Sequence, residues 1–527
     1  MTRSHDAIFI GGGHNALIAA AYLARAGWSV LVLEKNDRPG GFVRTEELTL
    51  PGFVHDTYAT AHPLFVTGPA YAELRDELEA RGLHYLNCDI PAGVSMPGGR
   101  SSVLFRDPAA SVAELDRLAP GDGAAFMKLI EGFSAHAGSI FPLFSMNLAS
   151  PEANAFIRKL MLGEGGLGLS SFAADFMMSA RDLLETRFRS EVFRGLISPW
   201  LLHAGRGPEE PNSAFWLTLF LLSVLSGGVP TPAGGSEMLV KALVRLIEDH
   251  GGEIRSHCAV ERILVEGGEA RGVVTADGER YHARRAVIAS TNPDQLYLKL
   301  LAGTGVVHPE IERQAKGFRY GRGAVQVHLA LSAPPDFPDE RLRRGGLVHL
   351  TTGLDGLSRA INEAARGLLP AEPTISFDVP SALDPARVPP GKAVARLQML
   401  EVPRRARGDA AGLIDVGDGV WNDDLKNRFA DRVLEIAAKH VPNLKSSILA
   451  RRVIGPADLA RFNPNAGDGD PYGGAHDLAQ SYFLRPIAGQ PSHRTQVPNL
   501  YMIGAATWPG HGVGGGSGYI VAKQLLA

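Results

Sequence analysis

The feature that most constrains the fold of this chain is a glycine-rich turn between an apolar strand and a helix near its start. Residues 7–10 read as a strand, residues 11–15 (GGGHN) as a turn, residues 16–27 as a helix and residues 29–35 as a second strand. Gly27 stands where a helix commonly ends. A unit of this kind predicts an α/β fold in which helices cover a parallel sheet.

The turn fits the G-x-G-x-x-G/A pattern of dinucleotide-binding proteins, with Gly11, Gly13 and Ala16 at its three small positions and His14 and Asn15 between them. The first glycine allows the tight turn, the second lets backbone N–H groups approach a pyrophosphate, and the third small residue lets the helix pack closely on the strand. The N-terminus of a helix carries about half a positive charge and unpaired N–H donors, which suit a diphosphate. The turn therefore predicts a dinucleotide site.

An acidic residue completes the pattern at the end of the second strand. Glu34, followed by Lys35, lies where a carboxylate accepts hydrogen bonds from the ribose hydroxyls of a dinucleotide and disfavours a 2′-phosphate. The alternative interpretation is a solvated carboxylate at a strand end.

Size, charge and cysteine content exclude several classes of protein. A chain of 527 residues is expected to form two or more lobes. The net charge of −3 gives no support for a nucleic-acid partner or an anionic membrane surface; peripheral membrane contact and oligomeric state stay open. The two cysteines, Cys88 and Cys258, form no CxxC pair, so we expect no metal site and no disulfide-reductase activity.

The first residues and the longest apolar run bear on the location of the chain. The N-terminus enters the first strand almost at once and leaves no room for a signal peptide, so a cytoplasmic location is expected. The apolar run at residues 214–225 is shorter than the roughly 20 residues that cross a bilayer.

The turn alone does not distinguish FAD from NAD, but the rest of the chain does. Residues 70–230 read as mostly helical, whereas an NAD dehydrogenase would usually complete its sheet at this point. A second glycine pair, Gly40 and Gly41, follows Glu34, and a strand, a glycine-dense loop and a helix occupy the last 30 residues. Contacts from separated segments favour a long, extended cofactor, which predicts FAD.

Several blocks, in order along the chain, resemble the FAD-dependent amine oxidase and phytoene desaturase superfamily. The sequence is most similar to its phytoene-dehydrogenase-like branch, of the pyridine nucleotide-disulfide oxidoreductase domain-containing protein 2 type. The blocks are IGGGHNALIAAAYLARAGWSVLVLEKNDRPGGFVRT, PTPAGGSEMLVKALVRLIEDHGGEI, VERILVEGGEARGVV, GPADLARFNPNAGDGD, LRPIAG and NLYMIGAATWPGHGVGGGSG.

The resemblance implies two domains assembled from separated segments. A Rossmann-type FAD-binding domain would comprise residues 1–75, 230–300 and 480–527. A mixed α+β substrate domain with a helical insertion would comprise residues 76–229 and 301–479.

The resemblance also implies cofactor contacts beyond the first turn. Gly40, Gly41 and Arg44 would lie along the pyrophosphate and ribityl region, Val260 would hold the adenine through its backbone, and Gly504 and Ala505 would pass the ribityl chain. A helix N-terminus at Gly515, Gly516, Ser517 and Gly518 would stabilise negative charge on the reduced flavin.

The sequence departs from the family pattern at two positions. Many relatives have arginine after the Gly-Gly pair, where this chain has Phe42, so either Arg44 substitutes or the contact is absent. Many amine oxidases carry an acidic residue in the terminal motif, where this chain has Ala506. The second departure agrees better with a desaturase-like enzyme than with a strict amine oxidase.

Four residues are candidates for catalysis. By resemblance, Trp508 and His511 lie on a loop that faces the flavin; the alternatives are a core aromatic and a loop histidine bonded to backbone. His55 and Asp56 belong to a segment that often approaches the flavin in relatives, where either could polarise substrate or take a proton, whereas Asp56 could instead cap a turn.

Two further polar residues and one apolar segment have two interpretations each. His203 is a satisfied buried histidine or a site residue, and Arg485 binds an acidic group of the substrate or an internal carboxylate. The apolar segment at residues 215–221 packs in the core or lines a cavity for a hydrophobic alkene or terpenoid.

These observations predict an FAD-dependent oxidoreductase that dehydrogenates or isomerises a mostly apolar small molecule, with hydride passing to flavin N5. The alternatives are an amine oxidase that produces an imine and hydrogen peroxide, and a flavin-binding partner protein without turnover.

Overall fold

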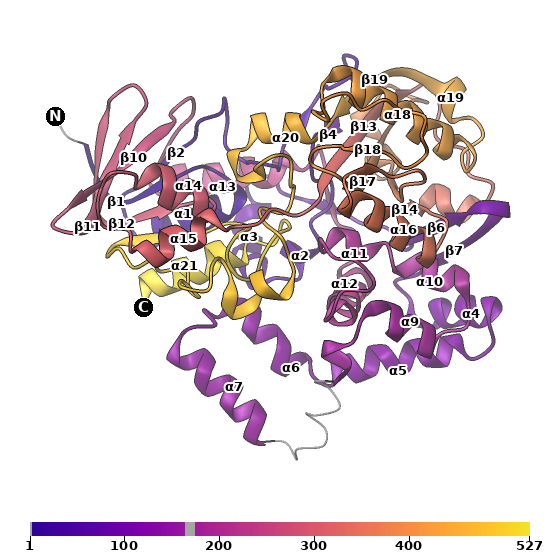
Figure 1. Cartoon of the computed structure of the whole chain (residues 1–527), viewed down its shortest axis with the longest axis horizontal. Coiled ribbons are helices and arrows are strands. Elements are labelled where there is room, and N and C mark those ends of the chain that lie inside the picture. Colours follow the sequence, from indigo (N-terminus) through magenta and orange to yellow (C-terminus); the bar gives the residue numbers. More distant parts are fainter. Residues whose placement is uncertain (1–2, 164–173) are drawn as a thin grey trace.

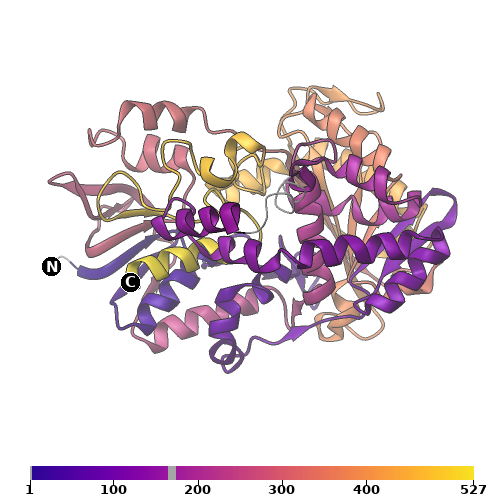
Figure 2. The ribbon, with the colours of Figure 1, turned by 90° about the horizontal axis from the view of Figure 1, so that it is seen from below.

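The computed structural model describes residues 3–163 and 174–527. Two seven-stranded sheets organise them, one on the left of Figure 1 beside both termini and one on the right. Helices from the first half of the chain lie below both sheets, and Figure 2 shows this helical layer from its own side.

The first sheet draws its strands from three separated parts of the chain. Its order is β10-β11-β12-β1-β2-β9, with β20 pairing the second half of β12. The pairs β1·β2, β1·β12, β2·β9 and β12·β20 are parallel, so their carboxyl ends share one edge of the sheet. The strands are β1 (Arg3–Ile10), β2 (Val30–Leu33), β9 (Glu253–Arg255), β10 (Val260–Glu266), β11 (Glu269–Thr275), β12 (Arg280–Ala289) and β20 (Leu500–Met502).

Four helices bury one face of the first sheet in a common core: α1 (His14–Arg25), α3 (Pro69–Glu79), α13 (Glu237–Asp249) and α21 (Gly516–Leu526). The approach of α1 to α21 is close because Gly518 lacks a side chain: a Cβ there would lie 2.0 Å from the carbonyl oxygen of Asn15. The opposite face packs against α14 (Pro293–Gln295), the turn at Leu296–Leu300 and α15 (Pro309–Lys316).

The second sheet has the order β19-β13-β17-β16-β14-β6-β7, and all its neighbours are antiparallel except β14 and β6. Its register places Gln326 opposite Gln398 and Asp378 opposite Arg396. The strands are β6 (Ala92–Met96), β7 (Arg100–Leu104), β13 (Gly323–Leu331), β14 (Leu347–Leu350), β16 (Ile375–Asp378), β17 (Ala393–Val402) and β19 (Ile448–Ile454).

Helix α18 (Asp423–Ala438) shares a core with this sheet and covers one of its faces. Helix α16 (Leu354–Ala365) packs near the ends of β15 and β17. The remaining short elements are β3 (Thr45–Glu46), β4 (His55–Asp56), β5 (Tyr85–Leu86), β8 (Thr231–Pro232), β15 (Leu368–Leu369), β18 (Gly408–Asp409), α2 (Pro63–Val66), α17 (Pro380–Leu383), α19 (Leu444–Ser447) and α20 (Pro456–Phe462).

The helical layer packs around α12, whose residues are apolar on nearly every side and mostly buried. Its members are α4 (Pro108–Leu118), α5 (Asp122–Ser134), α6 (Ala137–Ile140), α7 (Pro151–Gly163), α9 (Ala180–Arg187), α10 (Glu191–Ile197), α11 (Trp200–His203) and α12 (Ser213–Gly227). Within residues 3–163 and 174–527, no helix combines the length and apolarity that a membrane crossing requires.

The predicted fold class is confirmed, including the assembly of the first sheet from discontinuous segments. Every strand of the first sheet falls in the ranges assigned to the FAD domain and every strand of the second in those of the substrate domain, although the boundaries themselves stay predictions. The expectation of a mostly helical segment at 70–230 missed the hairpin β6–β7. This hairpin is a strand pair because β6 finds a partner in β14, about 250 residues further along.

Candidate active site

A cavity of 580 Å³ lies between the two sheets. One side of it is formed by the loops that follow the parallel strands of the first sheet, and the other by residues of β13, β16 and β17 in the second. Ligands of open α/β folds bind outside the carboxyl ends of the strands, so the position of the cavity is that of a cofactor site.

The backbone at Gly13 has no structural need for glycine. Its φ of −65° and ψ of 163° suit any residue, and the only neighbour of an added Cβ within 4 Å would be Ser290 Oγ, at 3.8 Å. Gly13 lines the cavity at the start of α1, so a side chain would project into the space that a ligand requires. This cradle fits a pyrophosphate held by backbone N–H groups.

A second glycine turn closes against the first. Gly40 donates its N–H to the carbonyl of Gly12 at 2.8 Å and forms a bridge with Gly13. Its φ of +127° and a distance of 2.6 Å from an added Cβ to the Val43 carbonyl oxygen require glycine at this position. The two glycine turns that the sequence singled out therefore form one wall of the cavity.

Glu34 is buried, so its interpretation as a solvated carboxylate was wrong. One oxygen accepts the N–H of Gly12 and the other the N–H of Asn36, both at 2.8 Å. Each carboxylate oxygen can accept a second hydrogen bond, and Glu34 lines the cavity, so it retains capacity for ribose hydroxyls.

Most predicted cofactor residues line this cavity, although their individual contacts with FAD stay predictions. Asn15 has a structural bond as well, because its Oδ1 accepts the N–H of Gly518 at 3.3 Å. The lining residues are Gly11, Gly13, His14, Asn15, Glu34, Lys35, Gly40, Gly41, Val260, Gly504 and Ala505.

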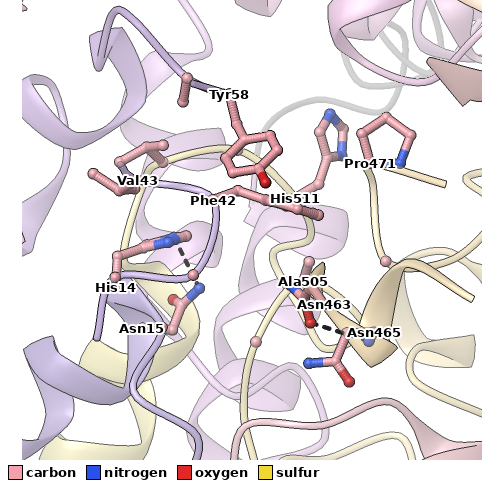
Figure 3. Close-up of a pocket in the computed structure, with 18 of the residues that line it drawn as sticks. His14, Asn15, Phe42, Val43, Tyr58, Asn463, Asn465, Pro471, Ala505 and His511 are labelled. Atoms are coloured by element: carbon pink, nitrogen blue, oxygen red, sulfur yellow. Dashed lines mark hydrogen bonds between the residues drawn. The ribbon is translucent and has the colours of Figure 1, made fainter. Parts of the chain in front are cut away.

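Several segments that line the same cavity were missed from the sequence, among them 290–292 and 463–465. Ser290 follows β12 directly, so its place at the carboxyl end of a parallel strand was a signal that could have found it. Asn465 donates to the carbonyl of Ser290 at 2.9 Å from a loop 175 residues away. This loop lies in the block GPADLARFNPNAGDGD, which supported the family resemblance, but none of its residues was assigned to the site. Figure 3 shows Asn463 and Asn465 across the site from His14 and Asn15.

Arg44 differs from its expected position along the cofactor. It lies outside the cavity lining, where its guanidinium forms a bidentate pair with Asp37, at 2.7 and 2.8 Å, and a further pair with Glu46 at 3.0 Å. The two carboxylates hold it because charge-assisted fork contacts are strong. Phe42, at the position where relatives carry arginine, lines the cavity instead and packs on Tyr58.

Ala16 and the glycine loop before α21 also lie outside the lining. Ala16 is fully buried in the core of the first sheet. An added Cβ at Gly515 would lie 2.2 Å from Ile18, and one at Gly516 would lie 2.7 Å from Pro509. Gly515 and Gly516 are therefore glycines for helix packing, and the segment that lines the cavity is the preceding one, His511, Gly512 and Val513.

Ser517 secures this arrangement from the first turn of α21. Its buried hydroxyl accepts the N–H of Gly504 at 3.0 Å and bonds Thr507 Oγ1 at 2.7 Å. The side chain thus positions the loop after β20, which lines the cavity through Gly504 and Ala505.

His511 combines both interpretations made from the sequence. It lines the cavity, and its Nε2 donates to the carbonyl of His203 at 2.6 Å, which leaves the lone pair on Nδ1. No residue of the described chain bonds that buried Nδ1. Burial, the largest cause, lowers the pKa of His511 to about 4, so the ring is neutral at neutral pH.

His203 lines the cavity beside His511 and is a half-buried histidine whose ring is hydrogen-bonded. Its Nε2 lies 3.2 Å from Nε2 of His349 and 3.3 Å from Oγ of Ser376, both on the second sheet. Burial lowers the pKa of His203 to about 3. A neutral histidine pair therefore connects the cavity to this sheet.

The second sheet contributes four polar side chains that no sequence pattern singled out: Gln326, Asp378, Arg396 and Gln398. Asp378 Oδ1 and Arg396 Nε form an ion pair at 3.0 Å. Gln326 and Arg396 both donate to the carbonyl of Tyr58, which fixes the loop that bears this tyrosine. In Figure 3 the rings of Tyr58 and His511 lie near the same end of the site.

Comparison with known proteins identifies the family. The family model for flavin-containing amine oxidoreductases matches residues 17–526. The chain belongs to this family. It is therefore an oxidoreductase enzyme whose cofactor is FAD, in agreement with the cradle at Gly13.

Individual relatives cover nearly the whole chain. This oxidoreductase is 28% identical over 557 residues to pyridine nucleotide-disulfide oxidoreductase domain-containing protein 2 of Mus musculus, with 99% of this chain and 93% of the relative covered. It is 26% identical over 544 residues to a limonene dehydrogenase polypeptide of Castellaniella defragrans, with coverage of 99% and 94%. Cyclohexylamine oxidase from Brevibacterium oxydans shares the fold, with a TM-score of 0.58, 18% identity and coverage of 99% and 98%.

Asp56 and His55, two catalytic candidates of this oxidoreductase, lie outside the cavity lining. Asp56 is buried, forms an ion pair with Arg387 at 2.6 Å, and accepts the N–H of Ser236 at 2.7 Å. His55 bonds Thr49 Oγ1 at 2.8 Å. Both therefore hold the β3–β4 turn against neighbouring segments.

Trp508 and Arg485 lie outside the lining as well. Trp508 is a buried aromatic whose Nε1 donates to the carbonyl of Leu143 at 2.8 Å. Arg485 bonds the carbonyls of Ala505 and Gln480 and the ring of His476, and no carboxylate of the described chain pairs with it. Both interpretations offered for Arg485 were therefore wrong, because backbone carbonyls satisfy it.

Proposed function

We propose that this oxidoreductase dehydrogenates or isomerises a mostly apolar small molecule. The observation that carries the proposal is the lining of the cavity on its substrate side. Phe220 of α12, Leu347 of β14 and Leu400 of β17 contribute apolar wall, and Leu64 extends it from α2. Apolar walls with a few placed polar groups are typical of sites for hydrophobic ligands.

The carboxylates of the lining support the same choice. Of those among the described residues, Glu34 accepts two backbone N–H groups, Asp378 is paired with Arg396, and Glu261 is exposed on β10. A protonated amine would find no unpaired buried carboxylate there. The name of one relative, a limonene dehydrogenase polypeptide, points to a hydrocarbon and agrees with this reasoning.

When bound, FAD would supply the acceptor for the two electrons and the hydrogen of a substrate C–H bond. Dehydrogenation also releases a proton from the neighbouring carbon, and the chain must accept it. His511 offers the unpartnered lone pair of Nδ1 for this purpose, and its donation to His203 fixes the ring. We assign the proton to this atom.

The test is anaerobic mixing of the holoenzyme with apolar alkenes and cyclic terpenoids while flavin absorbance is followed. We expect at least one of these compounds to bleach the flavin, and His511→Gln to slow that bleaching while FAD content and affinity for the compound stay unchanged. A parallel panel of amines under air, with peroxide as the readout, tests the amine oxidase alternative. Peroxide from amines, with no bleaching by any alkene, would overturn the proposal.

A further inference from the structure

The floor of the cavity carries hydrogen-bonding atoms that the protein leaves unused. Gln398 and Arg396 stand two residues apart on β17, and the register places Asp378 of β16 opposite Arg396. Side chains two residues apart on a strand share a face, so the three form one polar patch. All three line the cavity.

The ion pair between Arg396 and Asp378 leaves part of its hydrogen-bonding capacity without a partner in the described chain. Arg396 donates through Nε to Asp378 Oδ1 and through Nη1 to the carbonyl of Tyr58. Among the described residues, no hydrogen bond engages Nη2 of Arg396 or Oδ2 of Asp378. The pair therefore keeps one donor group and one acceptor atom available to a ligand.

Gln398 adds both a donor and an acceptor. Its side chain is 9% exposed, and neither amide atom has a hydrogen-bond partner in the part of the chain that the structure describes. Two further residues of the cavity lining also have unused polar atoms, because Nε1 of Trp200 and Oγ1 of Thr60 are buried without a partner among the described residues. Buried polar groups are nearly always hydrogen-bonded, so this concentration indicates a polar group on the ligand.

The charges of the patch select the kind of group. The guanidinium and the carboxylate already neutralise each other, so a charged ligand group would gain from one and be repelled by the other. A carbonyl could accept from Arg396 or Gln398 but has no hydrogen for Asp378. A hydroxyl accepts from the first two and donates to the third.

We propose that Asp378, Arg396 and Gln398 form a subsite for a hydroxyl group carried at one end of an otherwise apolar substrate. This inference rests on the proposed function and narrows its substrate class from hydrocarbons to apolar alcohols. The subsite orients the molecule, because only one end of it can hydrogen-bond to the floor while the rest contacts the apolar wall.

The test measures binding and needs no turnover, so it is independent of the outcome for the reaction. Holoenzyme is titrated with dihydroterpineol, a saturated tertiary alcohol, and with p-menthane, its parent hydrocarbon, while shifts of the flavin absorption bands are recorded. We expect the alcohol to bind more tightly than the hydrocarbon. Gln398→Leu should weaken binding of the alcohol by about five- to tenfold, which corresponds to the loss of one hydrogen bond, and should leave the affinity for p-menthane unchanged.

A matched control is Gln524→Leu, which removes an exposed glutamine of α21 and should change neither affinity. FAD content and the thermal unfolding midpoint confirm that each variant is folded. Asp378→Asn supplies a second variant, in which the amide no longer offers the charged acceptor. Binding of the alcohol should again be weaker than in the unmodified protein.

Three results would overturn the subsite. Equal affinity for dihydroterpineol and p-menthane would show that no hydroxyl is recognised. If menthone, a ketone of the same skeleton, bound as tightly as dihydroterpineol, Asp378 would not act as the acceptor of a hydroxyl hydrogen. Tighter binding of menthylamine, lost in Asp378→Asn, would assign the patch to a cation instead.

Discussion

Replacement of Gly13 by valine should separate folding from cofactor binding. The backbone at Gly13 already has angles that valine adopts, and the nearest protein atom to an added Cβ is Ser290 Oγ at 3.8 Å. The free energy of unfolding of the FAD-free protein should therefore change by no more than about 1 kcal/mol, since loss of glycine also restricts the unfolded chain.

The effect on FAD should be much larger. The new side chain occupies the cradle and displaces the pyrophosphate from the backbone N–H groups at the start of α1. Hydrogen bonds to charged groups are each worth about 1.5–3 kcal/mol, so the loss of two of them costs about 3–6 kcal/mol. This corresponds to a dissociation constant raised by about 10²- to 10⁴-fold.

The assay compares FAD content after gel filtration, the FAD dissociation constant and the unfolding midpoint of the FAD-free protein. Gly132→Val is the control, because Gly132 is exposed on α5 with nothing within 4 Å of an added Cβ. A yellow Gly13→Val protein with stoichiometric FAD would refute the placement of the pyrophosphate. A large loss of stability in the FAD-free variant would show that Gly13 serves the fold instead.

Three further predictions concern the scaffold of the site. Gly518→Ala should lower both the unfolding midpoint and FAD content, because its Cβ would meet the Asn15 carbonyl oxygen at 2.0 Å; an unchanged midpoint would contradict this. Asp56→Ala should reduce the free energy of unfolding, as measured by urea unfolding, by about 3–5 kcal/mol, because the buried Arg387 loses the closer of its two carboxylate partners and keeps only Asp384; normal stability with lost turnover would assign Asp56 to the chemistry. Acid should destabilise the fold. The pKa of His511 is lowered to about 4 in the folded protein and is about 6.5 in the unfolded chain, so its contribution to stability is fully present above pH 6.5. That contribution is lost as pH falls from 6.5 towards 4, by about 2 kcal/mol at pH 5 for one such histidine, and a flat unfolding midpoint between pH 7 and pH 5 would contradict it.

The cofactor side of the site was predictable because its signals are local. The strand, turn, helix and strand at residues 7–35 became β1, α1 and β2, with the helix ending two residues before Gly27. Gly40 and Gly41 follow β2 within a few residues, and Gly40 bridges to Gly13 of the first turn, which is close in the sequence. Glycine patterns of this kind carry their physical reason in the sequence.

The substrate side was not predictable in the same way. All nine residues of β13 are buried, so the alternation of side chains gives no exposed face from which to orient Gln326. Asp378 and Arg396 meet only after β16 pairs with β17, within a sheet that also recruits β6 and β7 from far earlier in the chain. Which polar residues face the cavity depends on this strand order, and no short stretch of sequence encodes it.

The contact between α1 and α21 has a consequence for biosynthesis. Asn15 is synthesised before its partner Gly518, which follows 503 residues later. The strand β20, the loop at Gly504 and the segment at His511 are equally late. Helix α1 of the nascent chain therefore stays only partly covered until α21 has left the ribosome. We expect FAD capture to follow the synthesis of α21, and FAD-free chains to depend on chaperones during that interval.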